Sequence, residues 1–169
     1  YIQPDGQLGL LVEVNCETDF VATNVSFRDF CNDVAKTLVE EPEADFESIR
    51  TSQVTKVGEN IQIGRHSKLE VEGSGMVAAY IHTGSKVGVL VEVGAGKDET
   101  TSQDAFKSLV KDITLQLAAA NPTTVSRESV DPNLIAKEKE IAAEQFKDKP
   151  AQAVEKILEG KIEKFFQNI

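Results

Sequence analysis

The residues best suited to chemistry stand together in one short segment of the chain. Positions 15–21 read Asn-Cys-Glu-Thr-Asp-Phe-Val, which places a thiol, two carboxylates and an aromatic ring within a few positions. An apolar stretch precedes the segment and an amphipathic one follows it, so we expect a loop between a strand and a helix, where functional residues concentrate. In the alternative interpretation, Phe20 and Val21 only cover the core, Cys16 fills a small buried space and both acids are solvated.

Two other kinds of site were weighed for the same residues. A nucleophile–base pair of Cys16 and His82 requires the fold to join them, and nothing in the sequence favours that pairing. A metal site would draw on Glu17, Asp19, His66 and His82. These residues lack the spacing typical of metal ligands, and His82 is interpreted most simply as a solvated histidine. The sequence therefore predicts no metal and no cofactor, and an enzyme built on Cys16 and His82 stays as a rival interpretation.

Charge and composition narrow the possible partners. Lys and Arg number 18 against 28 Asp and Glu, giving a net charge of −10 and a pI near 4.7. Such a chain repels phosphate backbones, so neither nucleic acid nor an anionic membrane is expected as a partner. The longest apolar run, around Leu8 to Val14, is broken by Gly9 and Glu13, so no membrane helix is expected. Two cysteines are too few for a disulfide framework and fit a reducing compartment.

The chain contains two copies of one sequence pattern. When Tyr1-Ile2 is aligned with Tyr80-Ile81, the Leu-Val-Glu-Val at positions 11–14 falls on the same tetrapeptide at 90–93 without a gap. Further matching pairs in this alignment are Phe27 with Phe106, Asp33 with Asp112, and Leu38 with Leu117. The repeat is too long for a solenoid, so the pattern indicates a duplicated subdomain.

Each copy predicts a small antiparallel sheet followed by a helix. Turn residues interrupt the apolar stretches at Pro4-Asp5-Gly6 and at Thr83-Gly84-Ser85. Apolar residues then recur at helical spacing; they are Phe27, Phe30, Cys31, Val34 and Leu38 in the first copy, and Phe106, Leu109, Val110, Ile113 and Leu117 in the second. The expected fold class is α+β, with helices on one face of each sheet.

The segments outside the repeat complete the predicted organisation. A weak helical pattern at 46–57 stops at Gly58, and residues 61–72 alternate as a strand that precedes the second copy. The first copy has no such strand before it, so its opening strand is expected upstream of Tyr1. Beyond residue 121, two apolar stripes around a turn at 148–150 predict an antiparallel helical hairpin. The expected domains are residues 1–72, 73–120 and 121–169.

Three blocks of the sequence resemble one protein family. Residues 11–22 (LVEVNCETDFVA) resemble the signature of translation elongation factor Ts, the nucleotide exchange factor for elongation factor Tu. Residues 57–63 (VGENIQI) and residues 80–82 with 87–91 (YIH, VGVLV) are similar to two further blocks of that family. The resemblance extends over essentially the whole chain and implies the long, two-subdomain form. It also implies a fragment that lacks the family's N-terminal helical domain and the segment after the hairpin.

The resemblance implies a function without chemistry of its own. An exchange factor of this kind promotes GDP release from elongation factor Tu by disturbing its Mg²⁺ and phosphate site and by stabilising the nucleotide-free GTPase. The implied contact residues are Thr18, Asp19, Phe20, Val21, Val57, Gly58 and His82. Among them, Phe20 is the implied inserted wedge and Asp19 its polar neighbour, while Val57 and Gly58 would contact a helix of the GTPase domain.

The same resemblance implies further partners and a compartment. The hairpin is an expected interaction arm and a possible site of homodimer formation. The bacterial cytoplasm is the expected location, with the mitochondrial matrix and the plastid stroma as alternatives. A non-catalytic binding module that docks through the hairpin remains the alternative function.

Overall fold

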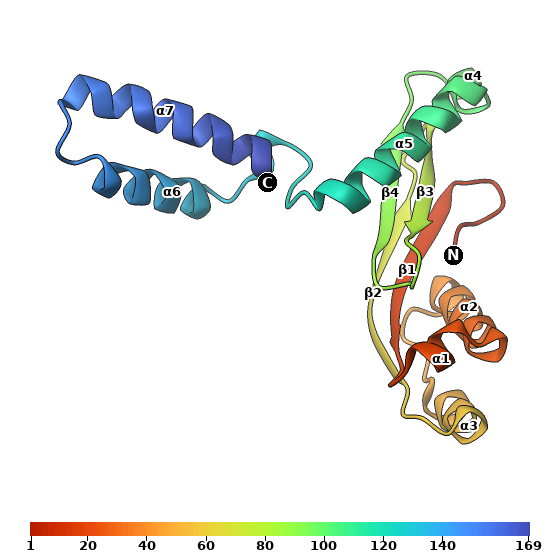
Figure 1. The fold of residues 1–169 in the computed structure, drawn as a ribbon. Helices are drawn as coiled ribbons and strands as arrows, with labels where there is room; N and C mark the ends of the chain where they lie inside the picture. The colour runs from red at the N-terminus through yellow and green to blue at the C-terminus, as the bar shows by residue number, and fades with distance from the viewer. The chain divides into compact units, whose positions relative to one another are not determined.

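The structure is a computed structural model that describes residues 1–169, except for the side chains of Ala151 and Asn168. Contacts divide the chain into two units, Tyr1–Ala118 and Ala119–Ile169. The elements, labelled in Figure 1, are β1 (Leu8–Asn15), α1 (Asp19–Thr23), α2 (Val25–Glu40), α3 (Glu47–Val57), β2 (Gln62–Glu70), β3 (Gly75–Ile81), β4 (Gly88–Gly94), α4 (Asp98–Thr101), α5 (Asp104–Ala120), η1 (Arg127–Ser129), α6 (Pro132–Gln145) and α7 (Ala151–Asn168). The α+β class predicted from the sequence is confirmed.

The strands form two antiparallel pairs. Strand β1 pairs with β2 from Leu8↔Glu70 to Asn15↔Gln62, with a register shift between Val12 and Val14. Strands β3 and β4 form a hairpin with a regular register. The sequence pattern places the strand at 61–72 before the second copy, whereas in the structure it pairs with β1. Its pairing could not be read from its sequence, because alternation predicts a strand but not its neighbour.

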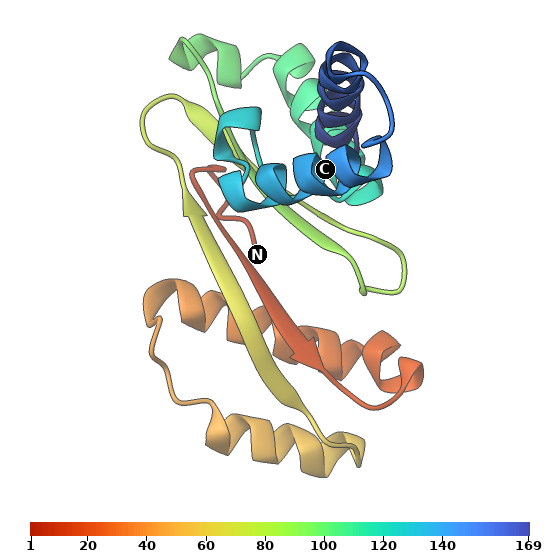
Figure 2. The ribbon, with the colours of Figure 1, turned by 90° about the vertical axis from the view of Figure 1, so that its left-hand side faces the viewer.

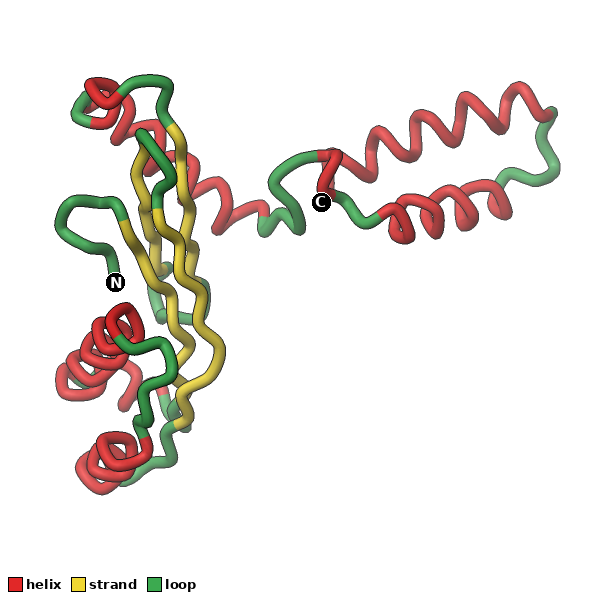
Figure 3. Tube along the Cα trace, turned by 180° about the vertical axis from the view of Figure 1, so that it is seen from behind, coloured by secondary structure: helices red, strands yellow, loops and turns green.

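The two strand pairs pack closely together, as the strands drawn in yellow in Figure 3 show. A Cβ placed on Gly9 would come within 2.6 Å of a Val77 side-chain atom and within 2.9 Å of one of Leu90. A Cβ placed on Gly88 would come within 2.9 Å of a Leu11 side-chain atom. Only glycine allows the strands to approach so closely at these two positions.

The helices of the first copy cover one side of β1 and β2 (Figure 1). Helix α2 begins where the Asn24 side chain accepts a hydrogen bond from the Ser26 N–H at 2.8 Å. Helix α3 ends at Gly58, whose φ of +76° is the left-handed conformation that glycine adopts without strain. The core of this part consists of Leu10, Val21, Phe27, Phe30, Val34, Ala35, Leu38 and Ile61. The helical stripe predicted for the first copy is thus the buried face of α2.

The second copy repeats the same order of elements. Strand β4 and helices α4 and α5 follow one another as β1, α1 and α2 do, and Asp98 begins α4 as Asp19 begins α1. The predicted stripe of α5 is wrong at one position, since Leu109 is 54% exposed. Phe106 and Val110 are buried as predicted. The equivalent residue of α2, Phe30, is buried in the core of the first copy, so the two helices differ at this position.

The second unit contains the antiparallel pair α6 and α7 (Figure 1). Helix α6 begins with Asp131 as its cap and Pro132 in its first turn. The guanidinium of Arg127 pairs with Glu163, with Nη1 at 2.9 Å from Oε2, and lies 5.0 Å from the centre of the Phe166 ring. Two apolar residues of α6, Leu134 and Ile141, remain exposed.

Candidate functional site

Phe20 and Val21 occupy one short helix but face in different directions. Phe20 is 88% exposed, whereas Val21 is 8% exposed and belongs to the core. Successive helical residues differ in direction by about 100°, so burying Val21 turns Phe20 away from the core. The interpretation in which both residues cover the core is therefore wrong for Phe20.

The predicted loop is also shorter than expected, because α1 begins at Asp19. Thr18 caps this helix: its hydroxyl accepts a hydrogen bond from the Val21 N–H at 3.4 Å. Thr23 donates its hydroxyl proton to the carbonyls of Asp19 and Phe20 at 3.0 Å each. A helix of five residues shows no apolar periodicity, so the sequence pattern could not predict it.

The end of α3 lies directly against this helix. After the turn at Gly58, the Glu59 carboxylate accepts hydrogen bonds from the N–H groups of Glu17 and Thr18, at 3.2 and 2.9 Å. The same carboxylate accepts the Thr18 hydroxyl at 2.5 Å. Because Glu59 directly follows Val57 and Gly58, its carboxylate joins the end of α3 to Thr18, from which a long stretch of sequence separates it.

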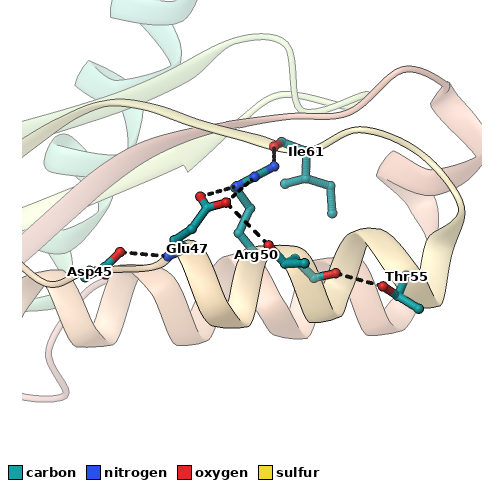
Figure 4. A network of polar contacts seen from close by, with 6 residues as sticks. Asp45, Glu47, Arg50, Thr55 and Ile61 are labelled. Atoms are coloured by element: carbon teal, nitrogen blue, oxygen red, sulfur yellow. Dashed lines mark hydrogen bonds and ion pairs between the residues drawn. The ribbon is translucent and has the colours of Figure 1, made fainter.

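A network at the other end of the same segment anchors α3 (Figure 4). The Arg50 guanidinium donates to the Ile61 carbonyl at 3.0 Å and to both carboxylate oxygens of Glu47, at 2.7 and 3.0 Å. Hydrogen bonding from Arg50 holds the pKa of Glu47 below its usual value. Asp45 accepts the Glu47 N–H at 2.9 Å and so caps the first turn of α3. Ile61, fully buried, fixes the chain just after Glu59.

The turn between β3 and β4 approaches α1 from the second copy, as Figures 1 and 2 both show. The Lys86 ammonium lies 3.5 Å from the Asp19 carboxylate. In the same turn, the His82 ring Nδ1 lies 2.8 Å from the Tyr80 hydroxyl. Both partners of the ion pair are exposed, so it contributes little stability, but it shows that this turn lies beside Asp19.

The structure thus brings the three sequence blocks to one end of the first unit. Thr18, Asp19 and Phe20 stand on or next to α1. The segment of Val57 and Gly58 is joined to Thr18 through Glu59, and the turn that follows His82 lies beside Asp19. Sequence reasoning assigned no role to Glu59 or Lys86. Glu59 lies inside the second block, so its position was visible, but its hydrogen-bond partners follow only from the fold.

Neither cysteine is prepared for nucleophilic chemistry. Burial is the main cause that raises the pKa of the Cys16 thiol, whose Sγ donates to the Thr18 carbonyl at 3.4 Å. Burial also raises the pKa of Cys31 to about 11. His82 bonds to Tyr80, so the described contacts do not join Cys16 to a histidine. Among the described residues, no three of His, Cys, Asp and Glu are grouped to hold a metal ion.

No described helix is both long enough and apolar enough to cross a bilayer. A surface hollow of about 620 Å³ lies between α3 and the start of β2. It adjoins the network of Arg50 rather than Phe20. The candidate site is therefore a protruding surface, of a kind that suits a macromolecular partner better than a small molecule.

Comparison with known proteins supplies the family. The family model described as "Elongation factor TS" matches residues 17–169. The chain is 36% identical over 172 residues to an elongation factor Ts of Nitratidesulfovibrio vulgaris (strain DP4), covering 99% of this chain and 60% of that protein. It is 38% identical over 181 residues to that of a Nitratiruptor species, covering 98% of this chain and 59% of that protein.

A relative from Clostridium botulinum (strain Alaska E43 / Type E3), also named elongation factor Ts, is 38% identical over 185 residues, covering all of this chain and 59% of that protein. The chain thus spans about 60% of the length of these curated relatives. The family match and the three sequence blocks agree, and the chain belongs to the elongation factor Ts family.

Proposed function

We propose that this chain acts as a guanine nucleotide exchange factor for elongation factor Tu, with Phe20 as an inserted wedge. The observation that carries the proposal is an aromatic ring left 88% exposed at the tip of a helix whose other side is fixed in the core. Aromatic side chains that stand in water and become buried in a partner are the usual centres of protein–protein binding energy.

The proposed mechanism follows from linkage. Elongation factor Tu holds GDP through a loop around the phosphates and a Mg²⁺ ion, the largest local charge in that site. A factor that binds the nucleotide-free GTPase more tightly than the GDP-bound form must weaken GDP binding by the same factor. Accelerating release by about 10⁴ requires about 5.5 kcal/mol of differential stabilisation. One buried aromatic ring and a few charge-assisted hydrogen bonds are of this order.

The other site residues take supporting roles in this proposal. Asp19 stands at the first turn of α1 and is the polar neighbour of the wedge. Val57 and Gly58 present the end of α3 to a helix of the GTPase domain, and His82 adds a contact from the second copy. Thr18 and Val21 hold α1 in place, the first as its cap and the second as its apolar anchor.

The proposal requires no chemical step in this chain. Both thiols have raised pKa values and stay protonated near neutral pH. The net charge of −10 supports a protein partner over nucleic acid or an anionic membrane. We propose the bacterial cytoplasm as the location, and the bacterial source of the named relatives supports this proposal. The mitochondrial matrix and the plastid stroma are the alternative compartments.

A second candidate function is docking through the hairpin without exchange. The observation in its favour is the exposure of Leu134 and Ile141 on α6. Apolar side chains of a two-helix hairpin that stay exposed are available to a second copy or to a partner. This candidate predicts binding without any change in the rate of GDP release.

The test measures GDP release directly. Elongation factor Tu loaded with fluorescent GDP is mixed with excess unlabelled GDP, with and without the chain. We expect the chain to accelerate release and Phe20→Ala to reduce the acceleration about thirtyfold, which corresponds to about 2 kcal/mol. The thermal midpoint should not change, because the ring is outside the core.

The chain offers a matched control for this experiment. Glu99 occupies in α4 the position that Phe20 occupies in α1, and it is likewise exposed. The Glu99→Ala chain should accelerate GDP release from elongation factor Tu as much as the unmodified chain does. Absence of acceleration by the unmodified chain, or full acceleration by Phe20→Ala, would contradict the proposal.

A further inference from the structure

We infer that Glu59 is a positioning residue that holds α1 in the orientation from which Phe20 protrudes. This inference rests on the proposed function for the importance of Phe20, but its structural part can be measured in the free protein. Glu59 lies outside α1 and follows the Gly58 turn that ends α3. Its carboxylate reaches across to the residues that immediately precede α1.

The Glu59 carboxylate accepts three hydrogen bonds from two consecutive residues, two from backbone N–H groups and one from a hydroxyl. Its Oε2 accepts the N–H groups of Glu17 and Thr18, at 3.2 and 2.9 Å. Its Oε1 accepts the Thr18 hydroxyl at 2.5 Å. Two acceptor oxygens are needed for this set, and only an ionised carboxylate offers acceptors alone. Charge-assisted bonds of this kind are about twice as strong as neutral ones.

The Thr18 hydroxyl connects this carboxylate to the helix. A hydroxyl has one proton to donate and lone pairs to accept with. Because its proton is donated to Glu59, its lone pairs face the Val21 N–H, which it caps at 3.4 Å. Glu59 therefore orients the very group that starts α1 and sets the direction of the next residues.

The contact is reciprocal across the two segments. The Glu17 carboxylate accepts the Asn60 N–H at 3.4 Å, so each segment supplies a carboxylate to the backbone of the other. The Glu59 side is itself fixed, because buried Ile61 follows Asn60 and Arg50 donates to the Ile61 carbonyl. The support for α1 thus comes from the core through Ile61.

Helix α1 needs this external support. Isolated helices of this length are unfavourable in water, because nucleation orders several residues for one hydrogen bond. The internal bonds of α1 are few, and they include the Ala22 N–H to the Thr18 carbonyl at 3.1 Å and the Asn24 N–H to the Val21 carbonyl at 2.9 Å. Loss of the Glu59 carboxylate should therefore loosen α1 and leave β1 and α2 folded.

The test compares Glu59→Gln with the control Glu43→Gln in the full chain. The amide keeps the shape of Glu59 but turns one acceptor into a donor that faces the Thr18 hydroxyl. Glu43 is exposed and lies in the connection at the opposite ends of α2 and α3. Hydrogen exchange should become about tenfold faster at the Val21, Ala22 and Asn24 amides in Glu59→Gln, with β1 and α2 unchanged. Glu43→Gln should exchange like the wild type.

The second measurement is GDP release from elongation factor Tu. We expect Glu59→Gln to reduce the acceleration about tenfold, and to have no further effect when Phe20→Ala is already present, because the two act through one ring. An unchanged hydrogen-exchange pattern overturns the inference. So does uniform loss of protection in β1 and α2, or an undiminished Glu59→Gln effect on release in the Phe20→Ala background. If the wild-type chain fails to accelerate release, the proposed function is wrong, while hydrogen exchange still decides whether Glu59 holds α1.

Discussion

Equivalent residues of the two copies carry different chemistry in similar short helices. Phe20 of α1 corresponds to Glu99 of α4, and Val21 corresponds to Thr100. Val21 is part of the core and fixes its helix, whereas the second copy has a polar residue there. The first copy therefore combines the exposed aromatic ring of Phe20 with the apolar residue, Val21, that anchors its helix. This pairing supports the proposal that α1, rather than α4, inserts into a partner.

Asp19→Ala should slow the stimulated release of GDP, but less than Phe20→Ala does. The carboxylate stands at the N-terminus of α1, where negative charge is favourable, and pairs with Lys86 at 3.5 Å. Exposed interactions of this size correspond to about a threefold to fivefold change in rate. Release measurements on Asp19→Ala, with Asp98→Ala in α4 as the matched control, test this expectation. A larger loss for Asp19→Ala than for Phe20→Ala would show that the carboxylate is the main contact.

Alkylation of the two thiols should be slow, especially at Cys31. With a pKa of about 11, only about one Cys31 thiol in a thousand is ionised near pH 8. A raised pKa keeps the thiol protonated until the pH approaches that value, so labelling should accelerate as the pH rises. Iodoacetamide labelling followed by mass spectrometry measures both sites. Rapid modification of Cys31 at neutral pH would contradict the burial seen here.

At the scale of elements, the sequence predicts the long helices and strands, in which apolar residues recur with a regular period. Helix α2 was predicted because five apolar residues repeat at helical spacing, and in the structure the helix continues just past the last of them, the buried Leu38, to Glu40. Helix α1 was missed because its five residues show no period. The pairing of β2 with β1 could likewise not be predicted, because alternation within a strand is the same whichever strand lies beside it.

The candidate site depends on those unpredictable contacts. The three sequence blocks could be recognised one by one, but their meeting depends on hydrogen bonds from Glu59 to Thr18 and on the Lys86–Asp19 pair. Each of these contacts joins residues that are distant in sequence. The exposure of Phe20 also became clear only from the fold, because the sequence was compatible with a buried Phe20 as well.

Gly58→Ala should reduce both stability and exchange. A Cβ at this position meets no atom within 4 Å, so the cost comes from the backbone, whose φ is +76°. An L-residue in this conformation costs about 1 kcal/mol or more. Relief of that strain would also move Glu59 away from Thr18. Thermal unfolding and GDP release should therefore both change, whereas Gly160→Ala within α7 should affect neither adversely.

At the scale of the whole molecule, the two units are expected to have separable tasks. The residues of the candidate site all lie in Tyr1–Ala118, and the hairpin lies in Ala119–Ile169. A hairpin of two helices leaves Leu134 and Ile141 exposed, which favours an interaction of its own.

Deleting residues 131–166 should therefore change the oligomeric state more than the rate of GDP release. Light scattering gives the mass of the deleted and the intact chains, and the fluorescence assay gives their exchange rates. An unchanged mass together with lost exchange would show that the hairpin belongs to the exchange surface.

The close packing at Gly9 and Gly88 also shows how the two copies are related in space. Gly9 of the first copy lies against Leu90 of the second, and Gly88 of the second lies against Leu11 of the first. These contacts exchange equivalent residues, which is the mark of an isologous interface between identical subunits. At these two glycines the copies therefore meet with local two-fold character, although the helices around them differ. Because the two copies belong to one chain, equivalent positions can carry different residues, as Phe20 and Glu99 do.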